Sequence, residues 1–201
     1  MQLRSKIAKS FVLRSIKLTR HQPPQWLAQK KSRSFLPSRA ADMSAPQIRV
    51  QREAFDQGQE LSAFSKKFAA SGAICSFTGQ MRDFRGATRA DGAPIVTMEL
   101  EHYPGMAERQ LADLAAEAHR RWPLDGLCVI HRYGVLRPTE AIVFVATASA
   151  HRGEAFAACE FLMDWLKTQA PFWKKETGAD GAQWVAAQDA DTTRASRWTK
   201  T

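Results

Sequence analysis

Basic side chains stand near the ends of several expected strands and helices, where folding can gather them around an anion. The candidates are Arg82, His151, Arg152, Lys167, Lys174 and Lys175. His151 and Arg152 directly precede a long expected helix, and a helix N-terminus suits an anion because unpaired N–H groups and a guanidinium converge there. Each residue alone also has an ordinary explanation, since a loop arginine is usually solvated and a lysine near a helix C-terminus favours the helix dipole. Taken as a set, they make an anion the first ligand to consider.

The spacing of the residues does not indicate a catalytic triad, a nucleotide-binding loop or a metal site. The sequence has no Ser-His-Asp order, no glycine-rich phosphate loop and no metal-ligand spacing, so we expect neither a metal site nor a bound cofactor. The cysteines Cys75, Cys128 and Cys159 favour positions in the core over a nucleophilic role. Their odd number and wide spacing fit a reducing compartment, so we expect a cytoplasmic protein.

The hydrophobic pattern predicts the elements that must position these side chains. Alternating or β-rich runs predict strands over residues 47–51, 73–78, 95–103, 127–132 and 141–148. Apolar residues at helical spacing predict helices over 59–69, 104–122 and 153–169, and glycines 178 and 181 predict a small hairpin that includes 183–185. This order favours a single compact α+β domain, with a mixed or antiparallel sheet and two long helices, over a doubly wound sheet.

Two segments carry more specific expectations. Residues 141–148 read Ala-Ile-Val-Phe-Val-Ala-Thr-Ala, which is apolar on both faces, so this strand should lie in the middle of its sheet. Residues 79–94 are rich in glycine and contain Arg82, Arg85 and Arg89. A stretch of this length and composition predicts a loop that is functional or mobile.

The charge of the chain is concentrated in its first fifth. The 201 residues include 29 Lys+Arg and 20 Asp+Glu, a formal net charge of +9. Residues 1–42 hold ten of the basic residues and one acid, which accounts for +9, so residues 43–201 carry 19 charges of each sign and are neutral. The neutral part predicts no nucleic-acid partner and no membrane partner. No window approaches 18 apolar residues, which excludes an ordinary transmembrane helix.

Residues 1–42 admit three interpretations. The segment is rich in Ser, Lys and Arg and lacks an apolar run with a cleavage site, so a secretory signal is not expected. The alternatives are a disordered basic extension ahead of a domain over 43–201, an organelle transit peptide, and a contact for nucleic acid or a membrane. We expect the first of these.

Five stretches of the neutral part form a recognisable series. They read Phe77-Thr-Gly-Gln-Met-Arg82, Leu100-Glu-His-Tyr-Pro-Gly-Met106, Val129-Ile-His-Arg-Tyr-Gly134, Ser149-Ala-His-Arg152 and Met163-Asp-Trp-Leu-Lys-Thr-Gln-Ala-Pro-Phe-Trp-Lys-Lys-Glu176. In this order they resemble the large, catalytic subunit of molybdopterin synthase. The resemblance runs from about residue 47 to Trp198, and residues 1–42 have no counterpart in it.

The resemblance implies a fold, an activity and partners. The fold is that family's α/β-hammerhead type, and the activity is sulfur transfer. A small ubiquitin-like partner carries sulfur as a thiocarboxylate on its C-terminal glycine. The sulfur passes in two rounds to cyclic pyranopterin monophosphate, which becomes the dithiolene molybdopterin, the precursor of molybdenum cofactor. The large subunit forms a homodimer within a heterotetramer that has one small subunit at each end.

The resemblance also gives roles to the basic residues. Lys167 and Lys174 are implied to be catalytic, with Lys167 acting as a general acid/base or holding the thiocarboxylate close to the pterin. Substrate binding is implied for Gln80, Met81, Arg82, His151, Arg152, Lys175 and Glu176. A nucleophilic cysteine is not needed, because the partner supplies the sulfur.

One position departs from the family pattern, and two other functions compete with sulfur transfer. Gln188 stands where family members often carry a basic residue, which puts the contribution of this position to substrate binding in doubt.

The competing functions are a nucleic-acid-binding module driven by the basic segment and a subunit that binds the small partner without turnover. Retention of both lysines and of His151-Arg152 argues against the second of these.

Overall fold

A computed structural model describes residues 45–199 except 87, 91 and 186–188. The expected basic extension over 1–42 and Gln188 therefore lie outside the described residues. In chain order the elements are β1 (Gln47–Gln51), α1 (Gln57–Lys67), β2 (Ala73–Gln80), β3 (Phe84–Arg85), β4 (Ala93–His102), α2 (Met106–Arg121), β5 (Leu124–Arg132), β6 (Gly134–Leu136), β7 (Ala141–Ser149), α3 (Arg152–Thr168), β8 (Phe172–Gly178), β9 (Gly181–Val185), α4 (Asp189–Ala195) and the 3₁₀ helix η2 (Ser196–Thr199). These elements confirm the predicted α+β class.

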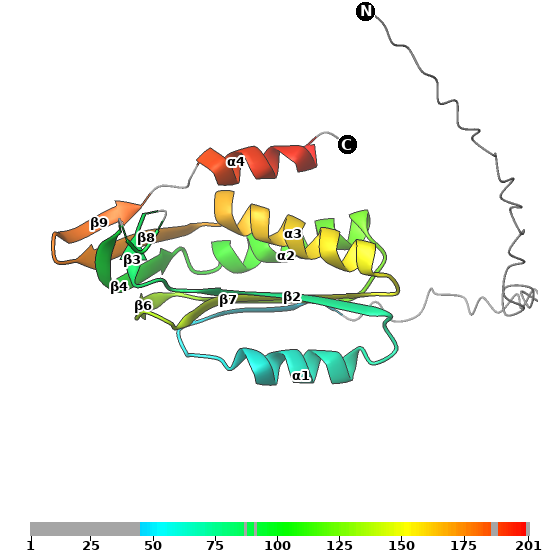
Figure 1. The fold of residues 1–201 in the computed structure, drawn as a ribbon. Helices are drawn as coiled ribbons and strands as arrows, with labels where there is room; N and C mark the ends of the chain where they lie inside the picture. The colour runs from blue at the N-terminus through cyan, green and yellow to red at the C-terminus, as the bar shows by residue number, and fades with distance from the viewer. Residues whose placement is uncertain (1–44, 87, 91, 186–188, 200–201) are drawn as a thin grey trace, which may run out of the picture. The chain divides into compact units, whose positions relative to one another are not determined.

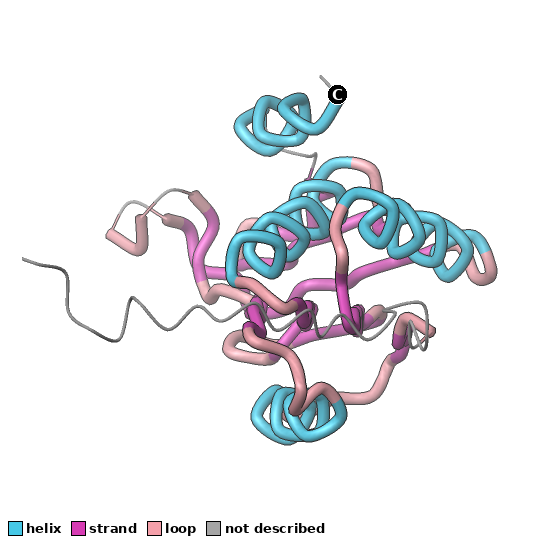
Figure 2. The backbone as a smooth tube through the Cα atoms, turned by 90° about the vertical axis from the view of Figure 1, so that its right-hand side faces the viewer, coloured by secondary structure: helices cyan, strands magenta, loops and turns pink. Residues whose placement is uncertain are grey.

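The first sheet is a mixed, four-stranded sheet between two layers of helices. Its order is β1-β5-β7-β2, with β1 parallel to β5 and the other pairs antiparallel. The long helices α2 and α3 cover one face and α1 covers the other, as Figures 1 and 2 show. Because β7 lies between β5 and β2, the predicted inner position of residues 141–148 is confirmed.

Both faces of the inner strands are buried, which explains their continuous apolar sequence. Along β5, Val129 faces the core beneath α2 and α3, whereas Cys128 and Ile130 face the core above α1. Side chains of β7 alternate in the same way, with Val145 on the first side and Phe144 on the second. The two cores share one sheet, so the sheet fixes where each helix lies.

The helices begin and end at residues with clear capping chemistry. The Asp56 side chain accepts a hydrogen bond from the Gln59 amide at 2.9 Å and so caps α1. Gly105 precedes α2 with a positive φ of 78°, and the Glu108 carboxylate accepts from its amide at 2.7 Å. Prolines 123 and 171 follow the ends of α2 and α3, as the sequence predicts.

A second, antiparallel sheet stands at one end of the first. Strand β4 pairs with β3 and β6 on one side and with β8 on the other, and β9 pairs with β8. The prediction of an uninterrupted loop over 79–94 is wrong, because Phe84 and Arg85 form β3 and pair with Pro94 and Ala93 of β4. The strand β6 and the helix α4 are additions to the expected elements, whereas the pairing of β8 with β9 across Gly178 and Gly181 confirms the predicted hairpin.

Within the described residues, no helix is both long enough and apolar enough to cross a membrane.

Candidate active site

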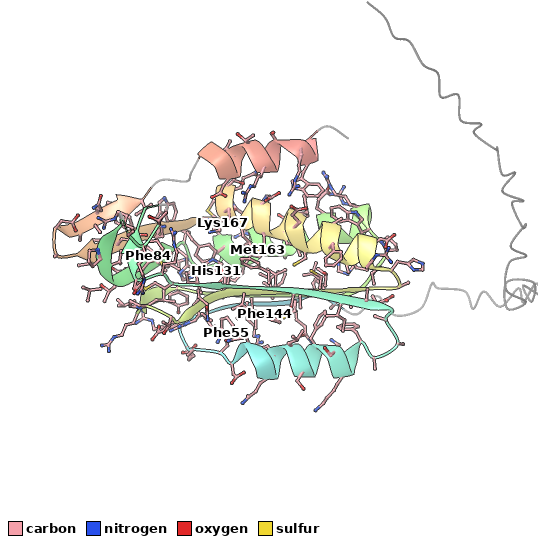
Figure 3. All side chains as sticks on the ribbon, in the orientation of Figure 1. Phe55, Phe84, His131, Phe144, Met163 and Lys167 are labelled. Atoms are coloured by element: carbon pink, nitrogen blue, oxygen red, sulfur yellow. The ribbon has the colours of Figure 1, made fainter. Side chains whose placement is uncertain are left out.

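A cavity of about 620 Å³ lies where the end of β2, the C-terminal end of α3 and the inner face of the second sheet meet. Predicted site residues line it from all three elements: Gln80, Met81, Arg82, Lys167, Lys174 and Glu176. Figure 3 labels four of the residues that line it: Phe84, His131, Met163 and Lys167. The fold therefore brings together both lysines for which the resemblance implies a catalytic role.

The chain reversal after α3 places the two lysines in one cavity. Lys167 lies in the last turn of α3, and its side chain is exposed. Helix α3 ends at Thr168, and β8 starts at Phe172 and runs back beside β4. Alternate residues of a strand share a face, so Lys174 and Glu176 point into the cavity beside Phe172.

Glu176 holds Lys174 in place within the cavity. Glu176 is 7% exposed, and its carboxylate accepts from the Lys174 ammonium and from the Arg85 guanidinium, each at 3.0 Å. Burial raises the pKa of Glu176, but the hydrogen bonds from Lys174 and Arg85 outweigh it and leave the pKa below its usual value. Glu176 is therefore ionised near neutral pH and acts as the anchor of two cations. The sequence alone gave Arg85 no role.

A hydrogen-bonded turn positions the segment that follows β2. The Met81 amide donates to the Glu140 carbonyl at 2.9 Å, and the Thr139 amide donates to the Met81 carbonyl at 2.9 Å. The buried Arg132 guanidinium donates to the Glu140 carboxylate at 3.1 Å, which ties this turn to the end of β5. Arg82 is the next residue, so its exposed side chain starts from a fixed point at the cavity rim.

Three predicted site residues do not line this cavity. His151 and Arg152 lie at the N-terminal end of α3 and are exposed. Arg152 and Lys167 are 15 residues apart on this helix, which corresponds to about 22 Å at 1.5 Å per residue. Lys175 points to the opposite face of β8, where its ammonium lies 5.6 Å from the centre of the Trp184 ring. A single chain does not gather these residues with Lys167.

The cavity contains a histidine that the sequence analysis did not select. His131 is 7% exposed and its ring stacks on Phe172, with centroids 3.8 Å apart and planes at 13°. Burial lowers its pKa to about 4, although its hydrogen bond to the Arg132 carbonyl acts in the opposite direction and the nearby Lys167 adds to the lowering. His131 is therefore neutral near pH 7. A single imidazole directly after the apolar run 127–130, inside one of the five motifs, is the sequence feature that marks this position.

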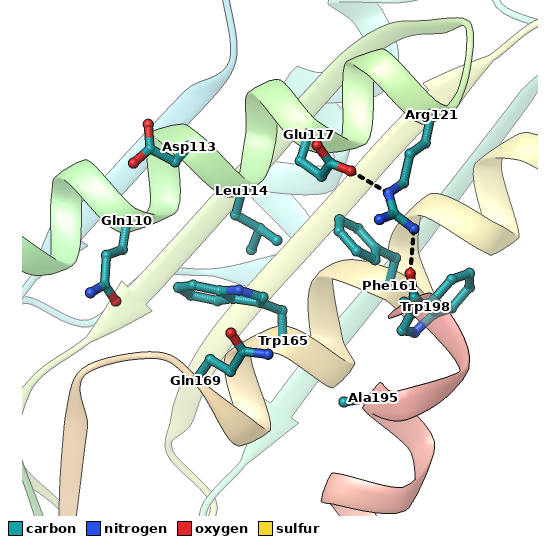
Figure 4. A pocket seen from close by; sticks show the side chains of 10 residues that line it. All are labelled: Gln110, Asp113, Leu114, Glu117, Arg121, Phe161, Trp165, Gln169, Ala195 and Trp198. Carbon is teal, nitrogen blue, oxygen red and sulfur yellow. Dashed lines mark hydrogen bonds and ion pairs between the residues drawn. The ribbon is translucent and has the colours of Figure 1, made fainter. Parts of the chain in front are cut away.

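A second hollow, of about 490 Å³, lies between α2, α3 and the C-terminal helices. None of the predicted site residues lines it (Figure 4). Its Arg121 guanidinium donates to the Glu117 carboxylate at 2.5 Å and to the Trp198 carbonyl at 3.0 Å, so these polar groups are already paired. Across the described residues, no group of three His, Cys, Asp or Glu side chains is arranged to hold a metal ion. The first cavity is the better candidate for an active site.

Comparison with known proteins identifies the family. A family model described as "MoaE protein" matches residues 50–169. The chain belongs to the MoaE family. The curated "Molybdopterin synthase catalytic subunit" of Cereibacter sphaeroides is 54% identical over 151 residues, which cover 75% of this chain and 99% of that protein.

Solved structures of MoaE relatives share the fold. The "Molybdopterin biosynthesis MoaE protein" of Burkholderia ambifaria matches with a TM-score of 0.64 and 46% identity, over 78% of this chain and 99% of that one. The molybdopterin synthase structure from Staphylococcus aureus matches with a TM-score of 0.59 and 29% identity, over 72% of this chain and 99% of that one. These relatives confirm the predicted family and fold, and they make this MoaE protein an enzyme of molybdenum cofactor biosynthesis.

Proposed function

We propose that this MoaE protein transfers sulfur from the C-terminal thiocarboxylate of a small ubiquitin-like partner to cyclic pyranopterin monophosphate, in the cavity between α3 and β8. The observation that supports it is the convergence of Lys167 and Lys174 on one cavity with Arg82 at its rim. The substrate phosphate and the partner's terminus are both anions, and cations in a partly enclosed site bind them strongly. Each round exchanges a sulfur of the partner's tail for an oxygen of the substrate, and two rounds give the dithiolene.

The two lysines differ in how they are held, which suggests different roles. Lys174 is fixed by its ion pair with Glu176, so we assign it to holding an anion at a constant position. Among the described residues, Lys167 has no ion pair and its side chain is exposed. We therefore assign to Lys167 the step that needs a mobile group: proton transfer to or from the reacting atoms, or holding the thiocarboxylate carbon close to the pterin.

A second copy of the chain is proposed to supply His151 and Arg152. They lie about 22 Å from Lys167 along α3, which is farther than one small substrate spans. In a homodimer, the exposed N-terminal end of α3 from one copy can approach the cavity of the other. Mixing a Lys167→Ala protein with an Arg152→Ala protein tests this, because mixed dimers regain one complete site. Activity that stays at the level of the two separate variants would contradict the shared site.

The partner and the compartment follow from the same proposal. We propose that the tail of the small subunit enters the cavity past Arg82, and that one small subunit binds each copy of the homodimer in a heterotetramer. We also propose a cytoplasmic location, which the three free cysteines support because thiols stay reduced there.

The test of the proposed function compares two lysine variants. Lys167→Ala is expected to lower dithiolene formation by about a hundredfold or more, which is the usual contribution of a positioned acid or base. Lys175→Ala is the matched control, because Lys175 points away from the cavity towards Trp184. Both variants should unfold at the wild-type temperature. Equal activity in Lys167→Ala and wild type would remove the proposed role of Lys167.

A further inference from the structure

His131 presents a hydrogen-bond acceptor to the active-site cavity. Its Nδ1 atom lies 2.8 Å from the Arg132 carbonyl oxygen. A carbonyl can only accept, so Nδ1 carries the ring proton and the neutral ring has its lone pair on Nε2. The ring lines the cavity, and no described residue donates to Nε2. Stacking on Phe172 holds the ring in this orientation.

A fixed, unused acceptor is unusual in this cavity. In their charged forms, Lys167, Lys174 and Arg82 can only donate hydrogen bonds. The Glu176 carboxylate already accepts from Lys174 and Arg85. The other lining groups that can accept, including Asp191, Gln80 and the threonine hydroxyls, lie on rotatable side chains, whereas the His131 ring is stacked and hydrogen-bonded on its far side. Neutrality matters here, since an imidazolium would add another donor.

We propose that His131 is a substrate-binding residue whose Nε2 accepts a hydrogen bond from a ring N–H group of the pterin. The inference rests on the proposed function and extends it, because the cations recognise the anionic parts of the ligands and cannot recognise a ring N–H. His131 recognises the ring of the ligand: it selects a heteroaromatic ligand that has an N–H donor over a simple phosphate. The burial that keeps the ring neutral is what makes the acceptor available.

Two substitutions separate the acceptor from the structural hydrogen bond. In His131→Asn the side-chain amide can still donate to the Arg132 carbonyl, but no acceptor remains at the position of Nε2. In His131→Gln the side-chain oxygen can reach that position, while the donor to Arg132 is lost. If His131 had only a structural role, His131→Gln would weaken pterin binding more than His131→Asn. If His131 binds the substrate, His131→Asn weakens pterin binding more than His131→Gln.

The experiment uses calorimetry to measure the binding of cyclic pyranopterin monophosphate to the full chain and to both variants. Inorganic phosphate is the comparison ligand. We expect His131→Asn to weaken pterin binding about ten- to a hundredfold, since a donor of the ligand is left unpaired. Phosphate binding should stay within about twofold of wild type, because the cations that hold an anion are unchanged. His131→Gln should keep pterin binding within a few-fold despite a lower unfolding temperature.

The outcomes distinguish failure of the inference from failure of the proposed function. Wild-type pterin affinity in His131→Asn would overturn the inference alone. Equal loss for pterin and phosphate would also overturn it, because it would show a general disturbance of the cavity. Absence of pterin binding by the wild-type protein would overturn the proposed function, and the inference with it.

Discussion

Acid should destabilise this protein through His131, and the size of the effect follows from its burial. The pKa of this histidine is lowered from 6.5 to about 4 in the folded protein, with burial as the main cause. Above pH 6.5 the ring is neutral in both the folded and the unfolded chain, so it contributes nothing to the pH dependence. Between pH 6.5 and 4 the unfolded chain binds a proton that the folded chain does not, so stability falls as the pH falls.

The expected loss is large enough to measure. At 1.36 kcal/mol per pKa unit, the free energy of unfolding should drop by about 2 kcal/mol between pH 7 and pH 5 on account of His131 alone. Below pH 4 this contribution stops growing, because both states are then protonated. Other groups titrate in the same range, so the change must be measured against a variant that lacks only this histidine.

The assay is urea unfolding of wild type and His131→Asn at pH 7 and at pH 5. Asparagine keeps a donor for the Arg132 carbonyl but cannot be protonated. Between pH 7 and pH 5, the free energy of unfolding of the variant should therefore fall by about 2 kcal/mol less than that of wild type. Linear extrapolation resolves a difference of this size. An equal fall in both proteins would refute the reasoning, since it would mean that His131 is not held neutral by burial.

Two further predictions concern packing and the active-site ion pairs. Gly126→Ala should destabilise the fold by about 1–3 kcal/mol in urea unfolding, because a Cβ there would lie 2.1 Å from the Phe68 ring; unchanged stability would show that the ring can move aside. Glu176→Gln should lower kcat/KM for dithiolene formation about tenfold, because Lys174 and Arg85 lose the charged acceptor that fixes them and the anion is held less well. A wild-type kcat/KM in steady-state assays would argue that the ion pair does not position Lys174.

The regular hydrophobic patterns of the sequence predicted the first sheet and the helices that cover it. Residues 141–148 are apolar on both faces because α1 and the α2–α3 layer bury both sides of β7, so the pattern had one physical cause. The second sheet was harder to predict. Strand β3 has two residues, and β8 carries the polar sequence Lys174-Lys175-Glu176, so neither has a hydrophobic period long enough to stand out.

The candidate site was predictable as a set of residue types but not as an arrangement. The reversal after Pro171 is visible in the sequence, and it does bring Lys174 to the cavity that Lys167 lines. Which face of β8 points inward depends on its register with β4, where Lys174 lies opposite Leu100, and no local pattern reveals that register. The position of His131 inside one of the five motifs marks it as a candidate, but its burial against Phe172 and its proximity to Lys167 are set by the fold and cannot be read from the strand alone.

Sulfur transfer itself can be measured by stoichiometry in a single reaction. The purified chain is incubated with cyclic pyranopterin monophosphate and a small ubiquitin-like partner that ends in a thiocarboxylate, and both products are followed by mass spectrometry. We expect two thiocarboxylates to become carboxylates for each dithiolene formed, with no product from a partner that ends in a carboxylate. A folded chain that binds both molecules but leaves the pterin without sulfur would contradict the proposed function.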